Sequence, residues 1–144
     1  METILLSILL HTVQPSLLLP VDNTVIALKV YPIPAFTQPP VDNLYAWGNC
    51  TRYVAGKVSI PNTWGNANTW LAESVAQGYV VGKQPKRGSI AWFEPGWSLG
   101  HVAYVEEVYS DNSFRISEMN VLGLNIISSR IITNDSVEFI YGKV

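Results

Sequence analysis

Cys50 is the only cysteine in this chain, so its thiol has no partner for an intramolecular disulfide. Three uses remain for such a thiol, which can be a buried apolar side chain, a weak metal ligand or a nucleophile. His101, Glu118 and Asn120 follow in the second half of the chain. An imidazole lowers the pKa of a neighbouring thiol and protonates the leaving amine, while an acid or amide orients the imidazole. These residue types predict nucleophilic catalysis by Cys50.

Two further side chains complete the predicted site. Asn49 precedes the thiol, and either its side chain or the backbone amide of Cys50 is a candidate donor to a developing oxyanion. Trp97 lies in a loop just before His101, where we expect it to contact the substrate. A single cysteine followed by a histidine and an acid or asparagine is the sequence outline of a papain-type thiol hydrolase.

The chain after residue 43 has the pattern of short helices followed by strands. A Gly48-Asn49 turn would place Cys50 in the first turn of a helix over 50–58, where the helix dipole favours the thiolate. A second helix would carry Trp70 and Val75 on one face and end at Gly78. Alternating segments separated by turns predict strands at 89–93, 101–109, 113–119, 124–133 and 137–141. The order predicts an α+β domain with short N-terminal helices packed on a mainly antiparallel sheet.

The predicted strands also suggest which side chains meet. His101 opens one strand, whereas Glu118 and Asn120 close the next, beyond a predicted hairpin at Asp111-Asn112. The two ends of an antiparallel hairpin are neighbours, and residues two apart face the same side. His101 and Glu118 can therefore meet. Glu118 could instead be a solvated carboxylate at a strand end, and Asn120 could serve a turn.

Length and charge limit the classes of function. A chain of 144 residues is large enough for one domain with its own core, and we expect Trp64, Trp70 and Trp92 to lie in that core. The formal net charge of -2 provides no basic surface, so nucleic-acid binding is not predicted. The apolar runs near the N-terminus fall short of the roughly 20 residues that a membrane span requires. Glu2 at the start, with Lys29 as the first positive charge, does not fit a secretory signal.

Residues 1–42 differ from the rest of the chain. They are hydrophobic, and four prolines between Pro32 and Pro40 oppose both helix and central strand. His11 lies in this part and has no predicted role. We therefore expect an N-terminal arm or linker over 1–42 and a compact domain over 43–144.

Five segments in order resemble the CHAP domain, the cysteine- and histidine-dependent amidohydrolase/peptidase family of peptidoglycan hydrolases. They are Trp47-Gly48-Asn49-Cys50-Thr51, Trp64-Gly65-Asn66-Ala67, Pro85-Lys86-Arg87-Gly88-Ser89-Ile90-Ala91, Gly100-His101-Val102-Ala103-Tyr104-Val105 and Ser117-Glu118-Met119-Asn120. The resemblance implies a papain-like CHAP fold. It also implies Cys50 as nucleophile, His101 as general base and acid, Glu118 as the residue that orients His101, and Asn120 as an auxiliary polar residue.

The resemblance further implies cleavage of an amide bond in bacterial peptidoglycan, by an N-acetylmuramoyl-L-alanine amidase or an endopeptidase, through an acyl-enzyme. The alternative is an inactive CHAP-like module that binds or regulates the cell wall, for instance because the arm covers the groove. Some family members hold calcium in an acidic loop before the nucleophile. Here Asp42 and Tyr45 stand without a cluster of aspartates, so neither a metal nor another cofactor is predicted. We expect a monomer that acts outside the cell or in the wall, or a phage lysis protein.

Overall fold

A computed structural model describes residues 18–21, 24–27, 33–36, 42–94, 96, 99–133 and 136–144. The chain divides into two compact units, Met1–Pro32 and Ile33–Val144. In the first unit, β1 (Leu18–Val21) and β2 (Thr24–Ala27) form an antiparallel pair. The boundary expected at residue 43 stays a prediction, although Ile33 and Phe36 pack against the core of the second unit.

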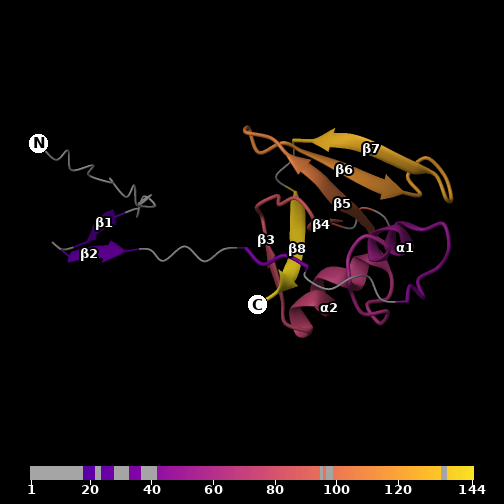
Figure 1. The fold of residues 1–144 in the computed structure, drawn as a ribbon, viewed down its shortest axis with the longest axis horizontal. Helices are drawn as coiled ribbons and strands as arrows, with labels where there is room; N and C mark the ends of the chain where they lie inside the picture. Colours follow the sequence, from indigo (N-terminus) through magenta and orange to yellow (C-terminus); the bar gives the residue numbers. More distant parts are fainter. Residues whose placement is uncertain are drawn as a thin grey trace, which may run out of the picture. The chain divides into compact units, whose positions relative to one another are not determined.

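An antiparallel sheet of six strands forms most of the second unit, among the residues described (Figure 1). In space its order is β3-β8-β4-β5-β6-β7, so the last strand of the chain lies between two earlier ones. The strands are β3 (Tyr79–Gly82), β4 (Ile90–Phe93), β5 (His101–Val108), β6 (Phe114–Met119), β7 (Ile127–Ile132) and β8 (Val137–Lys143). Each neighbouring pair is antiparallel.

Short helices precede the sheet in the chain. They are α1 (Cys50–Ala55), a 3₁₀ turn η1 (Ala67–Thr69) and α2 (Trp70–Ala76). Apolar residues of α1 and α2 share a buried cluster with side chains of β4, β5 and β8, including Val54, Trp70, Ile90, Val102 and Ile140. The alternate residues of the strands, among them Ala91, Ala103 and Phe139, belong to a second cluster on the other side of the sheet. The sheet is therefore buried on both faces near its centre.

Three tryptophans anchor the first cluster, as the sequence predicts. Trp64 and Trp70 are fully buried with their rings 5.6 Å apart, edge to face. Trp92 lies on β4, and its ring nitrogen donates to the carbonyl of Ala67 in η1 at 2.8 Å. This bond ties the helical layer to the middle of the sheet.

The predicted α+β organisation and the five predicted strands are confirmed, with ends that differ by a few residues. The hairpin at residues 111–112 is also confirmed, because Asn112 adopts a φ of 63° and the amide of Tyr109 donates to the carbonyl of Ser113. Strand β3 was not predicted from the sequence. The predicted face of the second helix is wrong in part, since Val75 is 54% exposed while Trp70 is buried.

Among the residues that the structure describes, no helix has the length and apolar character needed to cross a lipid bilayer.

Candidate active site

Cys50 is the first residue of α1, as predicted from the preceding turn. Gly48 has a φ of +78°, and its carbonyl accepts a hydrogen bond from the amide of Asn125 in the β6–β7 loop at 2.9 Å. A Cβ at this position would stand 2.9 Å from the side chain of Leu124. A glycine therefore lets the loop before the thiol lie directly against the β6–β7 loop.

His101 is the first residue of β5, and its position depends on a second glycine. Gly100 has a φ of +70°, and a Cβ there would lie 2.5 Å from the backbone nitrogen of Asn68. The amide of Asn68 donates to the carbonyl of Leu99 at 2.9 Å. The turn into β5 is thus held against η1, which fixes the starting point of the strand that carries the imidazole.

The predicted contact between His101 and Glu118 is confirmed. The Nε2 atom of His101 lies 2.8 Å from Oε2 of Glu118, and the side chain of Glu118 is 1% exposed. Because Nε2 faces the carboxylate, Nδ1 is the ring nitrogen left for the thiol, with which His101 also shares a hydrogen bond. Cys50, His101 and Glu118 therefore form a line, drawn from α1, β5 and β6.

The pKa values of Cys50 and His101 are shifted in opposite directions from their ordinary values. Burial raises the pKa of the Cys50 thiol, but the hydrogen bond with His101, a backbone hydrogen bond with Val102 and the positive imidazole lower it further, so the net shift is downward. Burial lowers the pKa of His101, yet its bonds to Cys50 and Glu118 raise it overall to about 9. The arrangement favours a thiolate beside an imidazolium at neutral pH.

Arg130 on β7 is a residue of this site that the sequence did not reveal. Its Nε donates to Oε1 of Glu118 at 2.8 Å, and a terminal nitrogen reaches Oε2 at 3.3 Å. Burial raises the pKa of Glu118, but the hydrogen bonds from His101 and Arg130 lower it overall. No motif marks Arg130, because the contact depends on the register in which β7 pairs with β6.

Asn49 and Asn120 meet each other. The Nδ2 atom of Asn120 donates to Oδ1 of Asn49 at 2.9 Å. Asn49 occupies the N-cap position of α1 without a side-chain capping bond, and it lines the same hollow as Cys50. Asn120 follows the end of β6 with a φ of +69°, so strand alternation does not set its direction. The expectation that Asn120 faces the same side as Glu118 because they are two apart does not apply.

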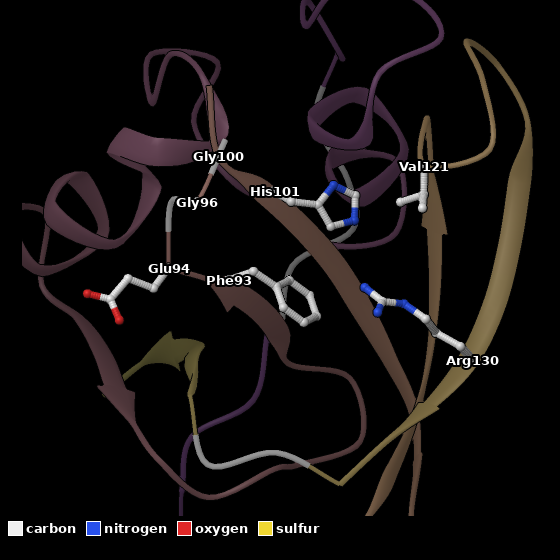
Figure 2. A pocket seen from close by; sticks show the side chains of 7 residues that line it. All are labelled: Phe93, Glu94, Gly96, Gly100, His101, Val121 and Arg130. Carbon is white, nitrogen blue, oxygen red and sulfur yellow. The ribbon is translucent and has the colours of Figure 1, made fainter. Parts of the chain in front are cut away.

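Two hollows meet at His101. One, of about 480 Å³, is lined by the candidate residues Asn49, Cys50, His101 and Asn120 together with parts of η1 and the loop at 44–46. The other, of about 360 Å³, also borders His101 and is lined as well by Phe93, Val121 and Arg130 (Figure 2). Trp97, predicted to contact substrate from the loop before His101, lies outside the described residues.

Two backbone oxygens of the loop before Cys50 are bonded to an arginine. The carbonyl oxygens of Asn43 and Tyr45 accept hydrogen bonds from Nη1 of Arg52 at 2.8 and 2.9 Å. A positively charged guanidinium therefore already occupies the position next to these two oxygens. Within the part of the chain that the structure describes, no three His, Cys, Asp or Glu side chains gather where they could hold a metal ion.

The part of the chain that carries these residues matches a known protein family. The family model of the CHAP domain matches residues 40–120, which include Cys50, His101, Glu118 and Asn120. The chain belongs to the CHAP domain family. Arg130 and strands β7 and β8 lie beyond the matched part of the CHAP domain.

Named relatives of this CHAP domain come from staphylococci. The staphylococcal secretory antigens SsaA of Staphylococcus epidermidis and Staphylococcus aureus are each 46% identical to it over 94 residues, which are 63% of this chain and 36% of theirs. A crystal structure of an N-acetylmuramoyl-L-alanine amidase from Staphylococcus aureus is 40% identical, with a TM-score of 0.62 over 67% of this chain and 30% of that one. The chain thus spans about a third of the length of each of these proteins.

Proposed function

We propose that this CHAP domain is a peptidoglycan hydrolase that cleaves an amide bond through the thiolate of Cys50. The single observation that carries the proposal is the line from the Cys50 thiol through His101 to the buried carboxylate of Glu118. A thiol that served only as an apolar side chain would need no imidazole beside it, and the imidazole would need no buried acid. Membership of the CHAP family and the amidase among its structural neighbours support the same conclusion.

In the first step the thiolate of Cys50 attacks the carbonyl carbon of the amide, and the carbonyl oxygen becomes an oxyanion. The backbone amide of Cys50 and Nδ2 of Asn49 donate hydrogen bonds to that oxygen. As the carbon–nitrogen bond breaks, the imidazolium of His101 gives its Nδ1 proton to the leaving nitrogen. An amine departs, and the acyl group stays on Cys50 as a thioester.

In the second step the now neutral His101 takes a proton from water while the water oxygen attacks the thioester carbonyl. The same two donors hold the oxyanion, and the carbon–sulfur bond breaks to restore the thiolate. A carboxylic acid leaves, and His101 is again an imidazolium. Throughout, Glu118 accepts from Nε2 of His101 and stabilises its positive charge without itself taking the proton.

The substrate class follows from the hollow that contains the thiol and from the neighbours of the chain. The hollow of about 480 Å³ around Cys50 is lined by several amide side chains, among them Asn62 and Asn66, which suit the polar backbone of a peptide. The amidase among the structural neighbours favours the bond between the lactyl group of muramic acid and L-alanine. An endopeptidase acting on stem peptides or cross-bridges remains the alternative outcome.

Loss of the thiol is the test of catalysis. Cys50→Ala should retain the circular dichroism spectrum of the wild type and lose clearing of purified cell walls in a turbidity assay. Cys50→Ser, which keeps the size of the side chain, should be nearly as inactive because a serine hydroxyl beside this imidazole lacks the low pKa of the thiol. If both variants cleared walls as fast as the wild type, catalysis by Cys50 would be wrong, whereas a wild type that itself clears no walls would favour the wall-binding or regulatory module.

Mass spectrometry of the released fragments identifies the bond. Purified peptidoglycan digested by an amidase yields free lactyl carboxylates together with peptides that start at L-alanine. An endopeptidase would instead generate new amino termini inside the stem peptide or the cross-bridge. We expect the first pattern, and the second would reassign the bond while keeping the thiol mechanism.

The cell wall is also the proposed place of action. The relatives in Staphylococcus carry the name secretory antigen, which supports an extracellular or wall-bound protein. Fractionation of the producing cells, followed by detection of this chain in wall and medium, tests this proposal. A phage source, the other expectation for this family, stays a prediction.

A further inference from the structure

Glu118 is a buried carboxylate, and burial alone would keep it protonated. Its side chain is 1% exposed, so ionisation requires compensating donors. His101 supplies one of them on Oε2, and this bond favours the ionised carboxylate. It leaves Oε1 without a donor from His101, so a second donor is needed to satisfy both oxygens.

Arg130 supplies the remaining donors. Its Nε meets Oε1 at 2.8 Å and a terminal nitrogen meets Oε2 at 3.3 Å, so one guanidinium contacts both oxygens of the carboxylate. Such a two-point contact fixes the rotation of the carboxylate as well as its charge. Because Oε2 is the atom that faces Nε2 of His101, the same contact determines where the imidazole finds its acceptor.

Phe93 holds the guanidinium in place from a third strand. The central carbon of the Arg130 guanidinium lies 5.3 Å from the centre of the Phe93 ring, and that ring lies 5.6 Å from the imidazole of His101. Figure 2 shows Arg130 reaching from β7 toward His101 with Phe93 beside both. Phe93 is the cross-strand partner of His101, so its position is set by the pairing of β4 with β5.

Other charged groups near this cluster are few in the described part of the chain. Cys50 of α1 interacts with the imidazole of His101, as Glu118 of β6 does. Glu94, at the end of β4, lines the same hollow as Arg130, but its carboxylate points away from the guanidinium (Figure 2). The groups that decide the charge of Glu118 are therefore His101 and Arg130.

We propose that Arg130 is a positioning residue for the thiol reaction, holding Glu118 ionised and turned toward His101 through its contact with both carboxylate oxygens. Arg130 acts through Glu118 and needs no contact with substrate. This inference rests on the proposed function for its role in hydrolysis, but the thiol of Cys50 reports on it without any substrate.

The test compares Arg130→Gln and Arg130→Lys with the wild-type full chain. Alkylation of Cys50 by iodoacetamide is followed by mass spectrometry between pH 4 and 10, because only the thiolate reacts. In Arg130→Gln the carboxylate should gain a proton at higher pH, so the acid limb of alkylation should move upward by about one pH unit or more. Arg130→Lys restores the charge with a single point of contact and should return the limb most of the way.

Kinetics on cell walls provide the second readout. Arg130→Gln should lower kcat by about 10- to 100-fold, part of what general acid–base catalysis contributes, and leave KM unchanged. Arg115→Gln is the matched control, since Arg115 lies on the adjacent strand β6 and pairs at the surface with Glu107. That variant should leave both the alkylation limb and kcat as in the wild type.

The outcomes separate the two proposals. A folded Arg130→Gln protein with the alkylation limb of the wild type would overturn the role of Arg130, even if wall cleavage by Cys50 is established. A shifted limb in a protein whose wild type cleaves no wall polymer would support Arg130 and overturn the hydrolase. An ordinary thiol profile in the wild type itself would overturn the positioning role, because the pairing that it serves would be absent. If Arg130→Gln does not fold, the neutral variant Arg130→Met takes its place: its acid limb should move upward in the same way, and an unmoved limb would overturn the role of Arg130.

Discussion

The side chain of Asn120 donates a hydrogen bond to that of Asn49 at 2.9 Å, which joins the end of β6 to the residue before the thiol. An amide whose oxygen accepts such a bond has its Nδ2 turned to the other side. Asn49, Asn120 and Cys50 all line the same hollow. Because of this bond we expect Asn120 to orient Asn49, the proposed oxyanion donor.

Removal of Asn49, the proposed oxyanion donor, should slow the reaction more than removal of Asn120, which is bonded to it. Asn49→Ala is expected to lower kcat by about 10²- to 10³-fold, as loss of one oxyanion donor does elsewhere. Asn120→Ala should cost about tenfold, because Asn49 remains but is free to turn. The double variant, measured in the same wall-clearing assay, should be no slower than Asn49→Ala. Additive losses would mean that the two residues act separately.

Glu118→Gln keeps the shape of the side chain and removes its charge. The pKa of His101 should fall from about 9, because the carboxylate is one of the groups that raise it. We expect a rate lower by about 10²- to 10⁴-fold at neutral pH and an alkaline limb displaced to lower pH. Glu107→Gln, at an exposed site on the neighbouring strand β5, is the control and should match the wild type. An unchanged rate in Glu118→Gln would remove this residue from the mechanism.

The pH dependence of kcat/KM should be a bell. The acid limb falls as the thiolate of Cys50 gains a proton, and it lies below the ordinary thiol range because the pKa of Cys50 is lowered. The alkaline limb falls as pH rises through about 9, because His101 then loses the proton that the leaving amine requires. The two limbs belong to the coupled pair and should both appear in assays on soluble wall fragments. Activity that keeps rising above pH 10 would contradict an imidazolium donor.

Chelation of metals should leave the activity unchanged. The carbonyls of Asn43 and Tyr45 are already bonded to Arg52, and Arg52 in turn accepts a bond from Asn43 through its own carbonyl. Wall clearing in excess EDTA tests the effect of chelation. Arg52→Gln should separately lower the free energy of unfolding by about 1–3 kcal/mol, as loss of bonds to a charged donor does, and urea denaturation measures this loss. Restoration of activity by calcium after chelation would show a metal site in the loop.

Gly100→Ala should destabilise the domain more than Gly78→Ala. Both glycines have a left-handed φ, which costs an alanine about 1–2 kcal/mol. Only at Gly100 would the added carbon also meet backbone, at 2.5 Å from the nitrogen of Asn68, whereas nothing lies within 4 Å at Gly78. Urea denaturation of the two variants isolates the clash, and Gly100→Ala should also lose activity because His101 follows directly. Equal free energies of unfolding for the two variants would show that η1 can move away from the added carbon without loss of stability.

Local pattern was sufficient to predict much of this site. The Gly48-Asn49 turn indicated a helix that begins at Cys50, and antiparallel neighbours indicated that His101 and Glu118 meet. These predictions hold because turn chemistry and strand periodicity act over a few residues. The sequence also indicated that Asn49 and Asn120 are polar residues of the site. Their mutual hydrogen bond joins residues 71 positions apart, and it depends on the close packing of Gly48 against the β6–β7 loop.

Other features depend on tertiary packing that no local signal encodes. Arg130 reads as an ordinary charge on an edge strand, and only the pairing of Ile116 with Arg130 and of Glu118 with Ser128 brings its guanidinium to the carboxylate. Val75 fits an apolar helix face by spacing, yet α2 buries Trp70 and Ser74 and leaves Val75 exposed. Strand β3 is short and was missed because β8, its partner, comes from the far end of the chain.

The place of β8 makes the sheet depend on a strand that carries none of the candidate catalytic residues. Val137–Lys143 follow all of those residues in the sequence and pair with both β3 and β4. A growing or truncated chain that stops before residue 137 already contains Cys50, His101, Glu118 and Arg130, but β4 then has no neighbour on one side. Such a chain leaves much of its second core cluster without a partner, since Val137, Phe139 and Tyr141 belong to it. A chain cut before residue 137 should therefore carry every candidate catalytic side chain and still fail to hold them in place, because the strand that completes the sheet lies apart from all of them in the sequence.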